Sequence, residues 1–171
     1  MIPMVSIVGK SDSGKTTLLE KLIRELTDRG YKIASIKHDA HSFEIDHEGK
    51  DSWRHKKAGA VLTLISSASK IAMVLDSDHD HTMKELRDKF IKDVDLILAE
   101  GYKREDLPKI EVFRSALRKE MLCSSQDNLI AVAGDPSSVP PGTPVFDLDD
   151  PKVLADFIEE KFLTPEKPVH R

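Results

Sequence analysis

Eight consecutive residues near the start of the chain match a pattern typical of phosphate binding. Residues 9–16 read Gly-Lys-Ser-Asp-Ser-Gly-Lys-Thr and fit G-x-x-x-x-G-K-[ST] at every defined position. Glycines let successive backbone N–H groups curl around phosphate oxygens, and the N-terminus of a following helix adds partial positive charge. We therefore predict a nucleotide site, with Lys15 at the β- and γ-phosphates and the Thr16 hydroxyl on Mg²⁺. The loop residues expected at the nucleotide are Gly9, Lys10, Ser13, Gly14, Lys15 and Thr16, of which Lys10 fits either a phosphate contact or a solvated position.

A site of this kind also needs an acid near the metal, at the carboxyl end of a neighbouring strand. Two acids bracket the apolar run that begins at Asp95 and ends at Glu100, next to Gly101. Asp95 opens this strand and should lie at the edge away from the phosphates. We therefore expect Glu100 to bind the Mg²⁺ ion or one of its water ligands. With Lys15, it forms the expected catalytic pair. The alternative interpretation is that Glu100 is only an exposed acid at a strand end.

A polar segment rich in histidine follows the second expected strand, so it should also lie near the phosphates. Asp39 could add an oxygen to the Mg²⁺ shell, and Lys37, His38 or Lys50 could contact an anion. The imidazoles at positions 38, 41 and 47 also suit a transition metal, although their spacing is loose and no cysteine helps. His79 and His81, in the acidic turn at 76–81, are explained by a solvated loop.

The elements that must position these residues follow from apolar patterning. Four apolar runs without polar alternation predict buried strands at Met4–Val8, Lys32–Ile36, Asp95–Ala99 and Leu129–Ala133, and another strand is expected at Lys109–Phe113. Helical spacing and end signals predict helices at Thr16–Arg29, Thr82–Ile91 and Pro151–Phe162. Two short apolar runs, Ala60–Ile65 and Lys70–Leu75, indicate a hairpin that would make the sheet mixed. The expected fold class is α/β: a three-layer domain like that of P-loop NTPases, with a mostly parallel sheet and an antiparallel hairpin insertion.

Composition limits the classes of function. The 171 residues carry 26 Lys and Arg against 30 Asp and Glu, a formal net charge of -4 that argues against non-specific nucleic-acid binding. No apolar run approaches the roughly 20 residues that span a bilayer. The single Cys123 forms no internal disulfide and no thiolate cluster, which favours the cytoplasm. We expect one nucleotide-binding domain over residues 1–163 and a flexible tail over 164–171.

Beyond the phosphate loop, a longer pattern links the chain to a known family. The residues K-H-x-x-H-x-F-x-x-D-x-x-G-K-D-S-x-R run from Lys37 to Arg54 and are followed by Ala-Gly-Ala at 58–60. Similar matches occur at Leu98–Lys103, Lys109–Arg114 and 131–135. Together with the loop, these motifs resemble the MobB family of molybdopterin-guanine dinucleotide biosynthesis proteins, over roughly residues 4–135.

The resemblance implies a GTP-binding accessory protein of molybdenum cofactor biosynthesis. Its partner would be the guanylyltransferase MobA, which joins GMP to molybdopterin, and molybdopterin itself could be met through that partner. The family is also associated with weak Mg²⁺-dependent GTP hydrolysis and with homodimers. Carried onto this chain, the resemblance adds Thr17 to the phosphate-binding residues and keeps Glu100 and Asp39 for Mg²⁺. The segments 37–54 and 103–114 would shape the rest of the site or a surface for the pterin phosphate.

Guanine recognition and hydrolysis lack their usual motifs. The guanine-reading N-K-x-D pattern is absent, since the sole asparagine, Asn128, precedes a leucine. Asp135 could accept hydrogen bonds from guanine N1–H and N2–H₂ instead, or it could be only a turn residue. No glutamine is placed to orient water, so hydrolysis should be slow and open to stimulation by a partner. The alternatives are a small-molecule kinase on the same loop and a metal-delivery GTPase that uses His38 and His41.

Overall fold

The computed structural model describes residues 1–39, 43–117, 120–135 and 137–163. The chain divides into two compact units, one made of Met1–His38 and Met83–Arg171 and the other of Asp39–Thr82. His41 and the predicted tail at 164–171 lie outside the described residues. The single domain expected over 1–163 stays a prediction.

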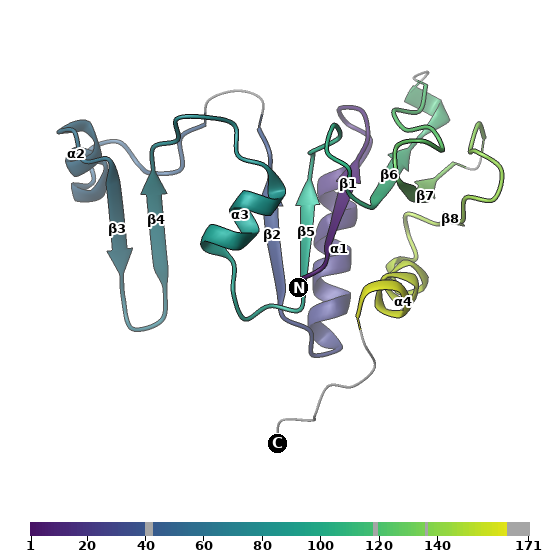
Figure 1. The fold of residues 1–171 in the computed structure, drawn as a ribbon, viewed down its shortest axis with the longest axis horizontal. Helices are drawn as coiled ribbons and strands as arrows, with labels where there is room; N and C mark the ends of the chain where they lie inside the picture. The colour runs from purple at the N-terminus through teal and green to yellow at the C-terminus, as the bar shows by residue number, and fades with distance from the viewer. Residues whose placement is uncertain (40–42, 118–119, 136, 164–171) are drawn as a thin grey trace. The chain divides into compact units, whose positions relative to one another are not determined.

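Six strands form the sheet at the centre of the first unit (Figure 1). Their order is β2-β5-β1-β6-β7-β8, and every pairing between neighbours is parallel. After β1, the chain adds β2 and β5 on one side of that strand and then β6, β7 and β8 on the other side. In such sheets ligands bind where the strand order reverses, so we expect a ligand at the carboxyl ends of β1 and its neighbours. The strands are β1 (Met4–Val8), β2 (Ile33–Lys37), β5 (Leu96–Glu100), β6 (Lys109–Phe113), β7 (Leu129–Gly134) and β8 (Val145–Phe146).

Helices cover both faces of this sheet. Leu96 and Leu98 of β5 belong to the core cluster that includes residues of α1 (Lys15–Asp28) and α4 (Pro151–Phe162). The alternate residues of the same strand, Ile97 and Ala99, instead pack in a second cluster with Met83, the first residue of α3 (Met83–Phe90). Successive side chains of β5 therefore point to opposite faces of the sheet and pack in two separate cores. Helices on both faces of the sheet give the three layers predicted from the sequence. None of the described helices is both long enough and apolar enough to cross a membrane.

The first helix begins directly at the phosphate loop. Gly14 precedes it with φ +100°, in the left-handed region that favours glycine. The buried face of α1 is made by leucines at helical spacing: Leu18, Leu19, Leu22 and Leu26. The helix ends at Asp28. Gly30, two residues later, also has positive φ, and the Tyr31 N–H donates to the Leu26 carbonyl at 3.1 Å. Local sequence thus sets both ends of the helix that presents Lys15 and Thr16.

The second unit contains a short helix and a separate two-stranded sheet. The helix α2 spans Asp51–Lys57, and the antiparallel strands are β3 (Leu62–Ser66) and β4 (Ile71–Leu75). On one face of the hairpin, Leu62 pairs with Leu75 and Leu64 with Met73, and all four side chains are exposed. On the other face, Thr63 is buried.

Most predicted elements are confirmed with bounds within one or two residues, and β1, β6 and α4 match the prediction at both ends. The expectation of a mixed sheet was wrong, because, among the residues that the structure describes, the two hairpin strands pair only with each other and the six-stranded sheet is parallel throughout. The prediction missed β8, α2 and the 3₁₀ turn η1 (Ser115–Leu117). These three elements are two, seven and three residues long, too short to show a period in the sequence.

Candidate functional site

The phosphate loop joins β1 to α1 and depends on glycine at both ends. Gly9 has φ +151°, and a Cβ atom at this position would lie 2.6 Å from the Val112 carbonyl oxygen and 2.8 Å from Ser13 Oγ. Such distances leave no room for any side chain. Gly14 has φ +100° and starts α1, so the first N–H groups of that helix face the loop. The backbone of this loop therefore has the glycine-dependent geometry that the pattern requires, and its role in phosphate binding stays a prediction.

Polar atoms of the loop are arranged for an anion. The Lys15 ammonium donates to the Lys10 carbonyl oxygen at 2.8 Å, which holds the lysine side chain over the loop. The Ser13 side chain is 1% exposed, and its hydroxyl has no hydrogen-bond partner among the residues described. A buried donor without a partner costs about 1–3 kcal/mol, which a bound phosphate oxygen would recover. This part of the site fits a nucleotide phosphate.

The structure brings the two expected Mg²⁺ residues together. Thr16 Oγ1, in the first turn of α1, donates to Glu100 Oε2, at the end of β5, over 3.0 Å. A hydroxyl and a carboxylate are both oxygen ligands of the kind Mg²⁺ binds, so this pair fits the ion. Asp95 directly precedes the same strand, and its carboxylate accepts from the Lys32 N–H at 2.7 Å. The two acids therefore occupy opposite ends of β5.

Backbone contacts around Gly101 hold Glu100 in place. The Gly101 N–H donates to the Ile7 carbonyl at 3.1 Å, and the Ser6 hydroxyl donates to the Gly101 carbonyl. The His38 N–H donates to the Glu100 carbonyl at 3.0 Å. A Cβ at Gly101 would lie 3.2 Å from that of His38, so the turn after β5 is also built for glycine.

Next to the loop lies a cavity of about 470 Å³. Arg114, which follows β6, connects the two, because its Nε donates to the Ser13 carbonyl at 3.0 Å. Asp135, which follows β7, accepts from the Ser115 hydroxyl and from the Ser137 N–H, and these bonds hold its pKa below the ordinary value. The cavity is lined by Arg114, Asp135, Phe146, Asp147, Leu148 and Asp149, among others.

From the sequence, Arg114 was expected only as part of the segment 103–114, and neither Asp147 nor the cavity was predicted. The position of Arg114, directly after a strand beside β1, was the available signal. Asp147 follows β8, which was not predicted. Of the other expected residues, Lys10 is half-buried, and Thr17 is exposed in the first turn of α1.

The histidine-rich segment belongs mostly to the second unit. Asp39, its first residue, is exposed, and its role at the metal stays a prediction. Within this unit, a cavity of about 560 Å³ is lined by Lys50, Ser52, His55 and Thr63, among others. The buried Thr63 hydroxyl has no hydrogen-bond partner among the residues described. Polar groups of the long motif therefore converge on a cavity in this unit.

Comparison with known proteins identifies the family. Residues 4–135 match the family described as MobB, molybdopterin guanine dinucleotide synthesis protein B. The chain belongs to the MobB family. The match begins at β1 and ends at Asp135, so it includes the phosphate loop, Glu100 and Arg114.

Individual relatives agree with this assignment. The chain is 38% identical to a molybdopterin-guanine dinucleotide biosynthesis adapter protein of Haemophilus influenzae over 92% of its own length and 88% of the relative's. The corresponding Escherichia coli protein is also 38% identical, over 94% and 93% of the two chains. Among solved structures, the crystal structure of Bacillus subtilis MobB superposes with a TM-score of 0.74 at 28% identity, covering 96% of this chain and 100% of that one. The MobB fold therefore extends over nearly the whole chain.

Proposed function

We propose that this chain is an adapter protein of molybdopterin-guanine dinucleotide biosynthesis that binds GTP with Mg²⁺. The observation that carries the proposal is the Thr16–Glu100 hydrogen bond of 3.0 Å beside a complete phosphate loop. This hydrogen bond supports a role for the Thr16 hydroxyl and the Glu100 carboxylate as Mg²⁺ ligands beside the loop that would bind the phosphates. Membership of the MobB family supports the pathway, since relatives with 38% identity carry the adapter name.

Roles follow from the positions of the residues. Gly9, Gly14 and the buried Ser13 hydroxyl form the cradle for the phosphates, and Lys15 neutralises their charge. Thr16 and Glu100 would hold Mg²⁺, which, when bound, neutralises negative charge on the phosphate oxygens. Lys10, Thr17 and Asp39 are proposed as further contacts to the nucleotide or to the metal.

The cavity beside Arg114 is proposed as the place of the guanine base. It adjoins the loop through the hydrogen bond from Arg114 to Ser13. Asp135 lines it as an ionised acceptor, which suits the two donors on the edge of guanine. Adenine lacks these donors, so this carboxylate favours GTP over ATP.

No described residue supplies a water-orienting group comparable to the Thr16–Glu100 pair, so we propose slow GTP hydrolysis. The partner is proposed to be a MobA-like guanylyltransferase in the cytoplasm, and contact with molybdopterin would occur through that partner. Two alternatives predict different results. A small-molecule kinase would transfer phosphate from ATP to a small alcohol. A metal-delivery GTPase would bind a metal ion, and changes at His38 and His41 would abolish that binding.

The central test is calorimetry of GTP and ATP binding to the parent chain and to Lys15→Ala. We expect GTP to bind more tightly than ATP, and Lys15→Ala to weaken GTP binding roughly hundredfold, about 2.7 kcal/mol. Lys32→Ala is the matched control, because Lys32 is exposed just before β2 and should leave binding unchanged. Equal binding by Lys15→Ala and the parent would contradict the nucleotide site.

A second measurement concerns catalysis. Single-turnover GTP hydrolysis is followed with and without a purified MobA-like guanylyltransferase. We expect slow hydrolysis by the chain alone and a faster rate with the partner. Fast turnover by the isolated chain would argue for an independent enzyme instead of an adapter.

A further inference from the structure

Arg114 carries hydrogen-bond donors that the fold does not use. A guanidinium group has five N–H donors and a permanent positive charge. Only Nε of Arg114 has a partner among the residues that the structure describes, and this partner is the Ser13 carbonyl at 3.0 Å. The side chain is exposed, and within the same residues no carboxylate forms an ion pair with it. The remaining donors and the charge are therefore available to a ligand.

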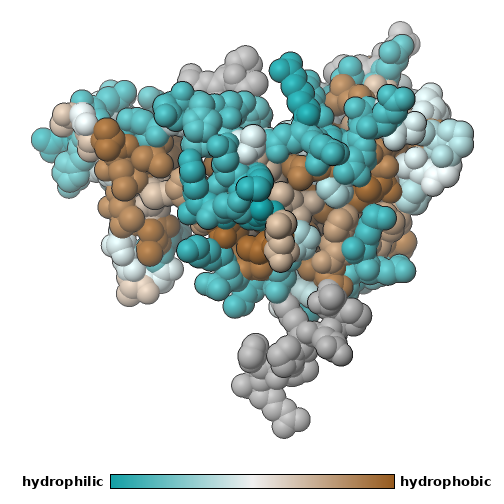
Figure 2. Space-filling model, viewed as in Figure 1, coloured by the Kyte–Doolittle hydropathy of each residue, from teal (hydrophilic) through white to brown (hydrophobic). Residues whose placement is uncertain are grey.

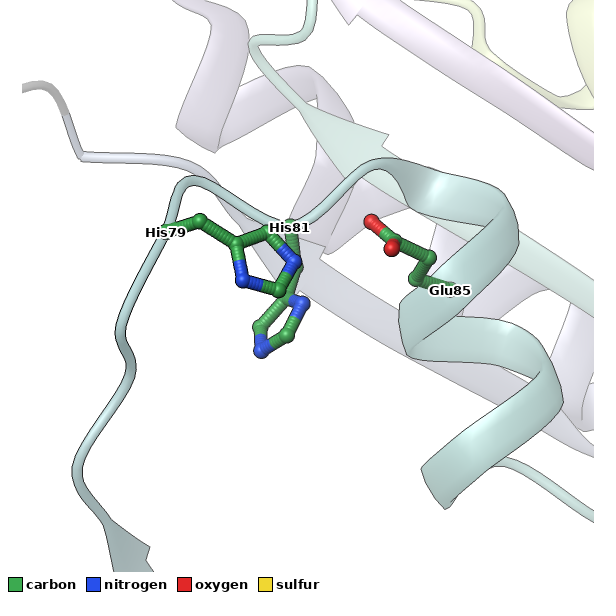
Figure 3. Close-up of side chains that lie close together, drawn as sticks. All are labelled: His79, His81 and Glu85. Atoms are coloured by element: carbon green, nitrogen blue, oxygen red, sulfur yellow. The ribbon is translucent and has the colours of Figure 1, made fainter.

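The histidines that precede α3 in the sequence are a contrasting case. The rings of His79 and His81 meet edge to face, with their centroids 4.0 Å apart (Figure 3). His79 Nδ1 also lies 2.6 Å from Asp78 Oδ1. These contacts join neighbours within one short segment, so this pair indicates no ligand.

The backbone places the guanidinium of Arg114 against the phosphate loop. Arg114 directly follows β6, and Glu111 of that strand pairs with Val8 at the end of β1. A Cβ atom on Gly14 would lie 3.6 Å from Arg114 Nη2 and 3.8 Å from Nε. Because Gly14 has no side chain, the guanidinium lies beside bare backbone at the start of α1.

The same side chain lines the cavity of about 470 Å³ beside the loop. The other charged residues that line this cavity are Asp135, Asp147 and Asp149. Asp149 already accepts from Lys21 Nζ at 2.9 Å, and Asp147 accepts from the Asp149 N–H at 2.8 Å. Among the described residues of the cavity wall, Arg114 is thus the one cation, and the acids have partners of their own.

The place between the loop and the cavity corresponds to one part of a nucleotide. This step rests on the proposed function, in which the loop binds the outer phosphates and the cavity binds the base. The atoms between them belong to the ribose and the α-phosphate, and of these two only the α-phosphate is an anion. The N–H groups of a guanidinium match phosphate oxygens in a bidentate geometry that a lysine ammonium does not provide. Lys15, which bonds to the Lys10 carbonyl over the loop, would serve the β- and γ-phosphates instead.

We propose that Arg114 binds the α-phosphate of the nucleotide through its terminal amino groups, Nη1 and Nη2. The bond from Nε to Ser13 fixes the orientation of the guanidinium. Arg114 therefore connects the phosphate half of the site to the base half. The ligand class is a nucleoside diphosphate or triphosphate.

The test is calorimetry with the two diastereomers of GTPαS, in which sulfur replaces one non-bridging oxygen of the α-phosphate. Sulfur accepts hydrogen bonds more weakly than oxygen, so a residue bound to that oxygen causes a loss of affinity relative to GTP, here called the sulfur penalty. We expect the parent chain to show a sulfur penalty of about fivefold with at least one diastereomer, and Arg114→Ala to show almost none. Arg114→Ala should also bind GTP about tenfold more weakly than the parent.

Arg24→Ala is the matched control, because it removes an exposed arginine of α1 and should retain the GTP affinity and the sulfur penalty of the parent. The sulfur penalty is a ratio of two affinities of the same variant, so partial misfolding of Arg114→Ala does not change it. A second readout uses the unaltered chain. In nuclear magnetic resonance, the guanidinium signals of Arg114 should shift when GTP is added, and those of Arg24 should not.

The role of Arg114 is overturned if the parent shows no sulfur penalty, if Arg114→Ala keeps the penalty of the parent with both diastereomers, or if GTP leaves the Arg114 signals unchanged. Arg114→Ala that binds GTP as tightly as the parent would overturn it too. In each of these cases, GTP binding by the parent and its loss in Lys15→Ala would leave the proposed GTP site intact. A parent chain that binds no GTP would contradict the GTP site and the role of Arg114 together.

Discussion

At the scale of single residues, the opposite ends of β5 carry acids with different surroundings. Glu100 meets the Thr16 hydroxyl at the carboxyl end, and Asp95 meets a backbone N–H at the other end. The side-chain chemistry is nearly the same, so position on the strand decides which acid can serve a metal. This contrast provides a matched pair of substitutions.

We predict that Glu100→Gln reduces the Mg²⁺ dependence of GTP binding about tenfold or more, because an amide is a weaker Mg²⁺ ligand than a carboxylate. Asp95→Asn should leave that dependence unchanged. GTP affinity measured over a series of Mg²⁺ concentrations distinguishes the two variants. An equal loss of Mg²⁺ dependence in Glu100→Gln and Asp95→Asn would mean that both substitutions disturb the strand, and that Glu100 has no specific role at the metal.

Asp135 is the residue on which base selectivity should depend. We predict that Asp135→Asn weakens GTP binding and improves binding of XTP, because an amide can donate to the C2 oxygen that xanthine carries in place of an amino group. Competition between GTP, XTP and ATP on the parent and the variant measures the change. Asp147→Asn, in the same cavity, is the comparison variant. If Asp135→Asn binds GTP, XTP and ATP in the same order of affinity as the parent, Asp135 does not recognise the base and is only a turn residue.

At the scale of elements, a partly buried network of side chains joins the residues that follow α1 to α4. Tyr31, which is 9% exposed, donates its hydroxyl to Glu159 Oε1 at 2.6 Å, and Arg29 donates to the other oxygen at 2.7 Å. The bond to Glu159, together with burial, raises the pKa of Tyr31 from 10.0 to about 12. Neutral tyrosine is therefore the form that the folded state favours.

A raised pKa in the folded state means that the stabilisation is fully present below pH 10.0 and is lost as pH rises toward about 12. We predict that Tyr31→Phe lowers the free energy of unfolding by about 1.5 kcal/mol at neutral pH. The difference from the parent should shrink across the alkaline range. Urea unfolding at several pH values tests this, and a difference independent of pH would exclude the hydrogen bond as its cause.

The elements also show which parts of the fold can be predicted from sequence. Buried strands such as β1 form unbroken apolar runs, the leucines of α1 recur at helical spacing, and glycines mark the loop between them, so both elements were predicted almost to the residue. The hairpin itself was predicted and is confirmed. Its separation from the large sheet was not predictable, because a short apolar run does not say whether a strand joins a larger sheet. The Thr16–Glu100 contact followed from topology, whereas the cavity of Asp135 and Asp147 required β8, whose two residues carry no signal.

At the scale of the whole molecule, the hairpin of the second unit bears on assembly. One face presents Leu62, Leu64, Met73 and Leu75, each more than two-fifths exposed, and Figure 2 shows hydrophobic residues gathered on this hairpin. A two-stranded sheet alone is marginally stable in water. We propose that this face pairs with the same face of a second copy, which would form the homodimer expected of the family.

We predict that the parent chain is a dimer in solution and that Leu64→Glu/Met73→Glu is monomeric, because each copy would then bring two charges to the buried interface. Val153→Glu, which places a charge on an exposed apolar position of α4, should remain a dimer. Light scattering on size-exclusion fractions gives the mass of each. If the double variant is still a dimer, the hairpin face is not the interface between the two copies.

The self-contained pairing of β3 with β4 has a kinetic consequence. Within the described ranges, each hairpin strand pairs with another strand on one side only, so about half of its backbone amides face no neighbouring strand there, in contrast to those of β1 between β5 and β6. Deuterium should therefore replace hydrogen at the hairpin amides long before it reaches β1. Dilution of the protein should accelerate exchange in the hairpin alone, which would make these amides a reporter of assembly within the intact chain.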